Sequence, residues 1–481
     1  MKHVHQTIPW LLIASLLFLH CERIKSPFEL PFETEFDSNH LLTDEELLTE
    51  EDPDAPAERA EWVEWISKNN IPIRSLDAEV FTDLQFLKPL LENRRIVQLG
   101  ESGHGVAQFS QAKVRLIKFL HQECGFDVIA FESSIFECFY TNENVASMTP
   151  IEMMRHSIFG VWHTREVEPL FDYIKNNHNT NSPLTLAGFD VQISSCLGVN
   201  NRPQFFKDVI SKIDFDFADD VYQLDSTFTV KTTHYSTYPN YLTNNQDTLI
   251  AQYENIVTFM DQHRDEYAQI FSDNPGVPLI VRQTAWSMIR YINELVEYDE
   301  ENYQSSTRWR DEGMADNLDF LLEELYPNSK IIVWAHNFHI RHWNLQVSGT
   351  IEVETMGTWV ALRHRPELYT IGLYMYRGQA AWNNREIYDI TRATSGSLES
   401  ILYRTRRKFC FVDLFNQTRG SGNSWMFEPI AAKTWGFSNI TMVLKNQYDG
   451  ILFIDTVNPP DYIPWNVYEK ALRKELLLYL N

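Results

Sequence analysis

The fold of this 481-residue chain is decided by the segment Ile96-Val97-Gln98-Leu99-Gly100-Glu101-Ser102-Gly103-His104-Gly105. An apolar run enters a glycine-rich turn here, and the next residues, Val106 to Glu123, carry apolar side chains at helical spacing along one face. Gly125 is typical of a helix end, and a second apolar run, Val128-Ile129-Ala130-Phe131, leads into Glu132. Two such runs joined by one helix predict neighbouring parallel strands with a right-handed crossover.

Two further apolar runs also end at polar residues. Residues 184–189 lead into Asp190, and residues 331–335 lead into His336 and His339. Additional strands are expected at 369–374 and 450–454. Continuous apolar runs suit strands that are buried on both faces, so we predict an α/β fold with a mostly parallel central sheet flanked by helices.

Ligands of parallel sheets bind beyond the carboxyl ends of the strands. We therefore expect the polar residues that follow the strands to share one rim: Glu101, His104, Glu132, Asp190, His336 and His339. Residues 200–305 are long, polar and aromatic, and they predict an inserted helical subdomain that covers this rim. The Trp and Tyr residues of 281–310 either line the site or pack the helices, and packing is the expectation for each of them taken singly.

The amino-terminal region predicts export. Residues 1–21 resemble a signal peptide, with Lys2 before a short apolar stretch, and Cys21 stands where a lipoprotein signal places its lipidated cysteine. Residues 22–58 are acidic and contain several prolines, so they predict a flexible tether to a domain that spans 59–481. We expect a periplasmic protein or a membrane-anchored lipoprotein, with membrane contact only through a lipid anchor at Cys21.

Composition narrows the classes of function. The net charge of −25 argues against a nucleic-acid partner and against adhesion to an anionic membrane surface. The five cysteines form no CxxC pair, which excludes zinc-ribbon and thioredoxin-like proteins, and the four that follow Cys21 are expected to be buried free thiols.

The expected rim carries residues suited to water activation. A carboxylate such as Glu101 can orient the ring of His104 and raise its basicity, so that the imidazole takes a proton from water. Glu132 is the second carboxylate beside it. His336 and His339 can donate hydrogen bonds to a developing oxyanion, or they can bind a metal ion together with the carboxylates.

Two other chemistries and a non-enzymatic function stay open at this point. A metal-dependent hydrolase could use the same glutamates and histidines, although their spacing is not that of the HExxH zinc proteases. Ser102, Asp190 and His336 stand in the order of a hydrolase triad, but the nucleophile-elbow pattern fails because residue 104 is His. A surface-tethered binding protein on a hydrolase-like fold is the third alternative.

Several long motifs, taken in order, resemble the erythromycin esterase family. They are residues 100–105 with the helix after them, 125–132, 188–190, 310–318 and 334–339. The resemblance covers roughly residues 90–460. It implies hydrolysis of a small-molecule ester or lactone by water activated on His104, with Glu101 and Glu132 positioning the base and the water, and with no acyl-enzyme, metal or cofactor.

By the same resemblance His336 and His339 belong to the catalytic site, and Lys113, Asp190 and Arg310 to substrate binding. One departure concerns Lys113, where the family often carries an arginine. Lysine keeps the charge but loses bidentate reach to a carboxylate. Recognition of macrolide-type substrates is therefore less firmly implied than water activation.

Overall fold

The computed structural model describes residues 39–232, 238–299 and 303–464. The described strands of the main sheet follow the order β1-β8-β11-β6-β2-β5-β3-β4, and β7 pairs with β6. A separate two-stranded sheet joins β9 and β10. The bounds are β1 Ile71–Pro72, β2 Ile96–Leu99, β3 Val128–Ser134, β4 Thr185–Asp190, β5 Ile331–Trp334, β6 Leu368–Ala381, β7 Ile387–Asp389, β8 Phe409–Asp413, β9 Pro429–Thr434, β10 Ser438–Val443 and β11 Gly450–Val457.

Parallel pairing dominates the middle of the main sheet. Strands β4, β3, β5, β2, β6 and β11 run parallel, while β8, β1 and β7 are antiparallel to their neighbours. The predicted α/β class is confirmed. One detail of the prediction was wrong, because β5 lies between β2 and β3 and pairs with both of them. The strand of Glu132 is thus not the neighbour of the strand before His104.

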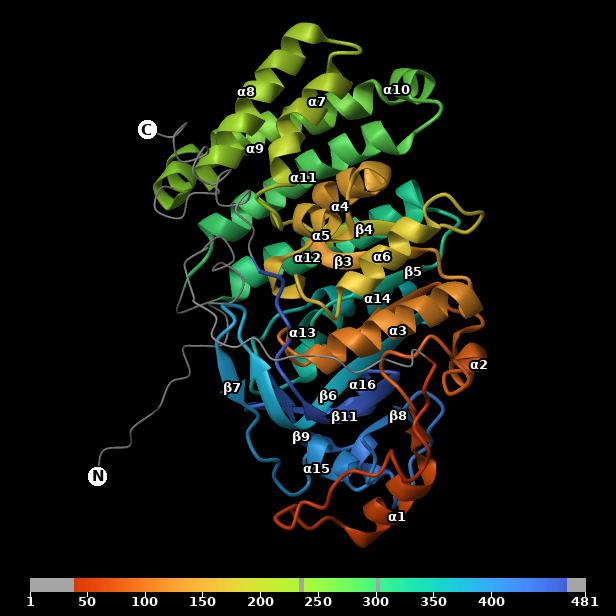
Figure 1. The fold of residues 1–481 in the computed structure, drawn as a ribbon. Helices are drawn as coiled ribbons and strands as arrows, with labels where there is room; N and C mark the ends of the chain where they lie inside the picture. The colour runs from red at the N-terminus through yellow and green to blue at the C-terminus, as the bar shows by residue number, and fades with distance from the viewer. Residues whose placement is uncertain (1–38, 233–237, 300–302, 465–481) are drawn as a thin grey trace, which may run out of the picture.

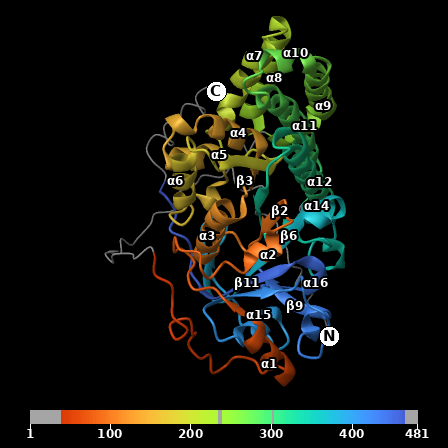
Figure 2. The same ribbon diagram turned by 90° about the vertical axis from the view of Figure 1, so that its right-hand side faces the viewer.

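Helices cover both faces of the sheet. Figure 2 shows α3, α5 and α6 on one side and α12, α14 and α16 on the other. The bounds on this part of the chain are α1 Ala60–Asn69, α2 Leu87–Leu91, α3 Ala107–Cys124, α4 Ile135–Glu143, α5 Pro150–Ser157, α6 Glu168–Asn177, α12 Gln304–Phe320, α13 Asn337–Ile340, α14 Met356–His364, α15 Leu398–Tyr403 and α16 Leu444–Gln447. Alternate strand residues feed two apolar cores, as in β5, where Ile332 and Trp334 join the α3 side and Ile331 and Val333 join the α12 side.

The predicted insertion is helical and has a core of its own. It contains α7 Arg202–Ile210, α8 Phe215–Thr232, α9 Tyr238–Gln262, α10 Arg264–Ile270 and α11 Gly276–Val296. Figure 1 shows these helices beyond the β4 end of the sheet. The insertion meets the rim on that side through α11. Its Trp286 and Tyr291 serve packing, since Trp286 lies against Arg290 and Tyr291 is buried. Trp309 of α12 lies against the same arginine.

Part of the predicted tether belongs to the folded body. Leu47 is fully buried, Thr49 Oγ1 donates to Asp455 at 2.5 Å, and the backbone N–H of Asp52 donates to the Tyr403 hydroxyl at 2.6 Å. Residues 39–58 therefore pack against the domain, because their acidic groups and Leu47 find basic and apolar partners there. The signal peptide, Cys21 and the tether residues 22–38 lie outside the described residues.

Two further expectations concern cysteines and membranes. Cys124, Cys138, Cys196 and Cys410 are free thiols, of which Cys138 and Cys410 are buried and the other two partly exposed. Among the helices of the described ranges, none combines the length and apolarity needed to cross a membrane.

Candidate active site

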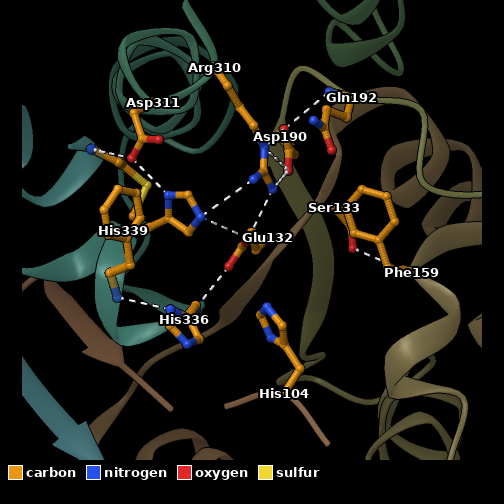
Figure 3. A network of polar contacts seen from close by, with 12 residues as sticks. His104, Glu132, Ser133, Phe159, Asp190, Gln192, Arg310, Asp311, His336 and His339 are labelled. Atoms are coloured by element: carbon orange, nitrogen blue, oxygen red, sulfur yellow. Dashed lines mark hydrogen bonds and ion pairs between the residues drawn. The ribbon is translucent and has the colours of Figure 1, made fainter. Parts of the chain in front are cut away.

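The expected rim residues come together at the carboxyl ends of four adjacent strands. Glu101 and His104 follow β2, His336 and His339 follow β5, Glu132 lies near the end of β3 and Asp190 ends β4. Helix α12 adds Arg310 and Asp311 from above (Figure 3). This confirms that a parallel sheet gathers these side chains into one cluster.

Glycines at two points of the β2 turn allow other segments to approach closely. A Cβ atom on Gly100 would stand 1.9 Å from Asn337 Oδ1, and one on Gly105 would stand 2.0 Å from the carbonyl oxygen of Ala381. The backbone N–H of Asn337 donates to the Glu101 carbonyl at 2.8 Å. The turn that carries Glu101 and His104 is thereby fixed against the segment that carries the other two histidines.

Glu101 and His104 form a carboxylate–imidazole pair with further support behind it. Glu101 is fully buried, and its Oε1 lies 2.6 Å from His104 Nδ1. Trp162 Nε1 donates to the same oxygen at 3.1 Å, and Lys113 Nζ donates to Oε2 at 2.6 Å. Because the carboxylate accepts the Nδ1 proton, the Nε2 atom of His104 is left with its lone pair, which is what a general base requires.

Lys113 is fully buried beneath this pair. Its ammonium also donates to the Ala335 carbonyl at 3.2 Å and lies 4.5 Å from the centroid of the Trp334 ring. Burial lowers the pKa of Lys113 to about 8, although Glu101 acts in the opposite direction. Lys113 therefore supports the carboxylate from inside the protein and has no exposed surface for a substrate.

His336 presents a free N–H group next to His104. Its Nδ1 accepts the backbone N–H of Phe338 at 3.1 Å, which assigns the proton to Nε2, and this buried Nε2 has no hydrogen-bond partner. Burial holds the pKa of His336 well below its usual range, and the neighbouring His104 acts in the same direction. The two rings have centroids 5.0 Å apart, and Figure 3 shows them side by side below Glu132.

His339 is held by two carboxylates. Its Nδ1 lies 2.8 Å from Asp311 Oδ1, and its Nε2 lies 3.3 Å from Glu132 Oε1. Burial alone would lower the pKa of His339, but Asp311 and Glu132 outweigh burial and raise it. The two carboxylates therefore favour the protonated form of His339, and its ring, whose Nε2 also faces Arg310 Nη1 at 3.4 Å, is held within the network rather than turned toward His104.

Arg310 connects Glu132 with Asp190. Its Nη2 donates to Glu132 Oε1 at 2.9 Å and to Asp190 Oδ2 at 2.6 Å. Burial would raise the pKa of Glu132, but His339 and Arg310 hold it far below its usual range. The other oxygen of Glu132 accepts the backbone N–H of His336 at 2.8 Å, so this ionic network fixes the backbone of the histidine beside His104.

An acidic group of the insertion borders this network. The side-chain amide of Gln192 donates to Glu294 of α11, and burial raises the pKa of Glu294 to about 8, with Arg310 acting against the rise. Glu294 is therefore mainly neutral at pH 7.

Indole rings cover the β2 side of the cluster. Trp162 and Trp435 have centroids 5.3 and 5.4 Å from that of His104, each in an edge arrangement. The His104 side chain is 11 % exposed, which is more than His336, His339 or Glu132. His104 is therefore the most accessible of these four groups.

The serine triad is not assembled. Asp190 is engaged by Arg310, the Nδ1 atom of His336 is occupied by a backbone N–H, and Ser102 Oγ is buried without a hydrogen-bond partner. Ser102 thus has no base. Over the described ranges no group of three or more His, Cys, Asp or Glu side chains is arranged to hold a metal ion.

The residues predicted to bind substrate occupy interior positions. Lys113 supports Glu101, and Asp190 and Arg310 pair with each other in the buried network. Four residues of the site were missed: Trp162, Asp311, Glu294 and Trp435. Asp311 stood in a quoted motif, directly after Arg310. Glu294 lies on the predicted helical insertion, where nothing singled it out, and Trp162 and Trp435 come from segments without a local pattern.

Comparisons with known proteins agree with this architecture. Residues 121–457 match the family model described as erythromycin esterase. "Putative hydrolase YbfO" of Bacillus subtilis (strain 168) is 32 % identical over 420 residues, which cover 84 % of this chain and 93 % of YbfO. "Erythromycin esterase type II" of Escherichia coli is 20 % identical over 337 residues, covering 66 % of this chain and 78 % of that protein.

Solved structures share the fold at low identity. A Bacillus cereus protein superposes with a TM-score of 0.72 at 19 % identity, covering 85 % of this chain and all of that one. A mutant of the erythromycin esterase EreC in its open conformation superposes with a TM-score of 0.61 at 17 % identity. The superposition covers 80 % of this chain and 96 % of that one. The fold and the site define an α/β protein with a glutamate–histidine cluster at the carboxyl ends of its parallel strands. The chain belongs to the erythromycin esterase family.

Proposed function

We propose that this protein hydrolyses a carboxylic ester or lactone with a water molecule activated by His104, without a covalent acyl-enzyme. The observation that carries the proposal is the Glu101–His104 pair, in which Nδ1 is bound to a buried carboxylate and Nε2 is left as a base. The absence of a base beside Ser102 favours attack by water over attack by a serine.

The reaction balances with these groups. His104 Nε2 takes a proton from water while the water oxygen attacks the carbonyl carbon, and the resulting oxyanion accepts the Nε2–H of His336. The tetrahedral intermediate collapses with cleavage of the bond between the carbonyl carbon and the alcohol oxygen, and His104 returns its proton to that oxygen. An ester gives an acid and an alcohol, and a lactone gives a hydroxy acid.

Glu132 and Arg310 act one step further from the reacting atoms. Glu132 fixes the backbone of His336 and Arg310 keeps Glu132 ionised, so that the oxyanion donor stays in place. Preorganised donors of this kind stabilise a developing charge without reorganisation cost. No metal or cofactor is needed for any of these steps.

A panel of macrolide lactones and simple carboxylic esters tests the proposal, with products identified by mass spectrometry. We expect wild type to add one water to at least one compound and His104→Ala to lose about 10²- to 10⁴-fold in rate while staying folded. His178→Ala is the matched control, because His178 follows α6, which leads to the start of β4 and thus to the amino ends of the strands, away from the site. Equal rates for wild type and His104→Ala would disprove the assignment.

The proposal includes an exported, lipid-anchored location. Its support is the apolar amino-terminal stretch that ends at Cys21. Fractionation of cells that express the full chain, with mass analysis of the mature amino terminus, should find a diacylated Cys21 in the membrane fraction. An unprocessed chain in the cytosol would contradict export.

A further inference from the structure

The hairpin between β9 and β10 carries an unusual residue at its turn. Three residues separate the paired Thr434 and Ser438. The first two, Trp435 and Gly436, have φ values of +56° and +69°, and the backbone N–H of the third, Phe437, donates to the Thr434 carbonyl at 3.4 Å. Tight hairpin turns with two positive φ values favour Asn-Gly or Gly-Gly. A tryptophan in the left-handed region is strained, because its Cβ approaches the following carbonyl oxygen.

The strained position places the indole on both reactive histidines. The Trp435 ring stacks on the His336 ring at 5.4 Å and 27°, and it meets the His104 ring edge-on at 5.4 Å. The backbone N–H of Trp435 donates to the Ser102 carbonyl at 2.5 Å, which ties the hairpin to the turn of Glu101 and His104. Strained residues that persist at such a place indicate a function rather than a packing preference.

Other rings hold the indole in position. Trp382 lies at 5.5 Å and 30° from Trp435, and Tyr388 lies at 4.7 Å from Trp382. Phe437, the residue after Gly436, packs edge-on to Trp382 at 5.2 Å. Trp435 is only 5 % exposed, so it is fixed between this aromatic cluster and the histidines.

We propose that Trp435 is a positioning residue that fixes the ring planes of His104 and His336 and shields them from bulk water. The proposal rests on the proposed function of these histidines. The free Nε2–H of His336 keeps its direction toward the carbonyl oxygen of the substrate because one face of its ring is covered. The edge-on contact of Trp435 likewise restricts the His104 ring, so that its lone pair stays directed at the attacking water.

Chemical modification tests this placement without a substrate. Diethyl pyrocarbonate acylates neutral imidazoles, and peptide mass spectrometry gives the rate at each histidine, with His40, whose side chain is 54 % exposed, as the internal reference. We expect Trp435→Ala to speed acylation of His104 and His336 about tenfold relative to His40, and Trp435→Phe to speed it only about twofold, because a smaller ring still covers them.

Kinetics on the substrate found in the panel complete the test. Trp435→Ala should lower kcat about tenfold to a hundredfold with a smaller change in KM, and Trp435→Phe should restore most of the loss. Trp425→Phe is the matched control, since Trp425 is fully buried against Trp65 rather than against the active-site histidines, and it should change neither readout.

Each outcome decides the matter. An unchanged acylation ratio at His104 and His336, or an unchanged kcat, in folded Trp435→Ala overturns the proposal. If circular dichroism shows Trp435→Ala unfolded, Trp435→Phe carries both readouts, and values equal to those of wild type overturn the proposal. If wild type cleaves no ester, the proposed function fails while the acylation ratios still determine whether Trp435 covers the histidines.

Discussion

Replacing Arg310 with methionine tests the ionic network that holds the oxyanion donor. Methionine has a similar length and no charge, so the variant leaves Glu132 and Asp190 buried without their shared cation. Removing one partner of a buried ion pair costs about 3–5 kcal/mol. Two carboxylates lose a partner here, but Glu132 keeps His339 at 3.3 Å and Asp190 keeps the backbone N–H of Gln192 at 3.1 Å.

These remaining contacts set the expected magnitude. We expect the free energy of unfolding to fall by about 4 kcal/mol at pH 8, within the range for one unpaired buried charge. Typical domains have only about 5–15 kcal/mol in total, so the variant should fold but unfold at much lower urea concentration. Arg264→Met is the control, because its ion pair with Glu324 is exposed and should contribute about 0–1 kcal/mol.

The pH dependence has a defined sign. In wild type the pKa of Glu132 is lowered, so this group stabilises the fold above the pKa of the unfolded chain and loses that contribution as pH falls. Without Arg310, the burial of Glu132 is less fully compensated and its pKa should rise, so the destabilisation should grow as pH rises. The loss should therefore be smaller at pH 5 than at pH 8. A loss below about 1 kcal/mol at pH 8, or an equal loss at both pH values, would refute this account of the network.

Three other predictions follow from single features. Burial lowers the pKa of Lys113 from 10.5 to about 8 in the fold, so the unfolded chain binds more protons between pH 8 and 10. The free energy of unfolding of wild type should therefore rise relative to that of Lys113→Met by about 1 kcal/mol per pH unit over this range. A difference that does not change with pH would contradict this prediction. A chain that begins at residue 59 should be less stable to urea than one that begins at residue 39 by about 2–3 kcal/mol, because it lacks the buried Leu47; equal midpoints would show that residues 39–58 add nothing. Dialysis against a chelator should leave ester hydrolysis unchanged, and a loss restored by one divalent metal would favour the metal-dependent alternative.

The sequence predicts the contents of the rim better than its geometry. Each of the four apolar runs is a strand, and the polar residues that follow the runs lie at the site, because strand direction alone determines which end of a parallel sheet a residue occupies. The order of the strands depends on pairing between segments far apart in the chain. For this reason the position of β5 between β2 and β3 was not predicted, although it is what places His336 beside His104.

The supporting residues were harder to predict for a related reason. Trp162 and Trp435 reach His104 from a short helical turn and a hairpin that have no period in the sequence to mark them. Lys113 illustrates the opposite case. Its spacing from Phe109 and Leu116 places it beside the inward face of α3, yet only the buried carboxylate of Glu101 explains why a lysine is wholly inside. The acidic composition of residues 39–58 predicted a flexible tether. In the structure these residues pack against the domain, where basic side chains pair with their carboxylates.

The charges of the cluster favour the step proposed for His104. A formal count with ionised carboxylates gives four negative charges, on Glu101, Glu132, Asp190 and Asp311, against three positive charges, on Lys113, Arg310 and protonated His339. The net charge is −1 while His104 is neutral, and it becomes zero when His104 takes a proton from water. The Glu101 carboxylate supplies the nearest of these negative charges, and it faces the positive charge that develops on His104 during the attack of water.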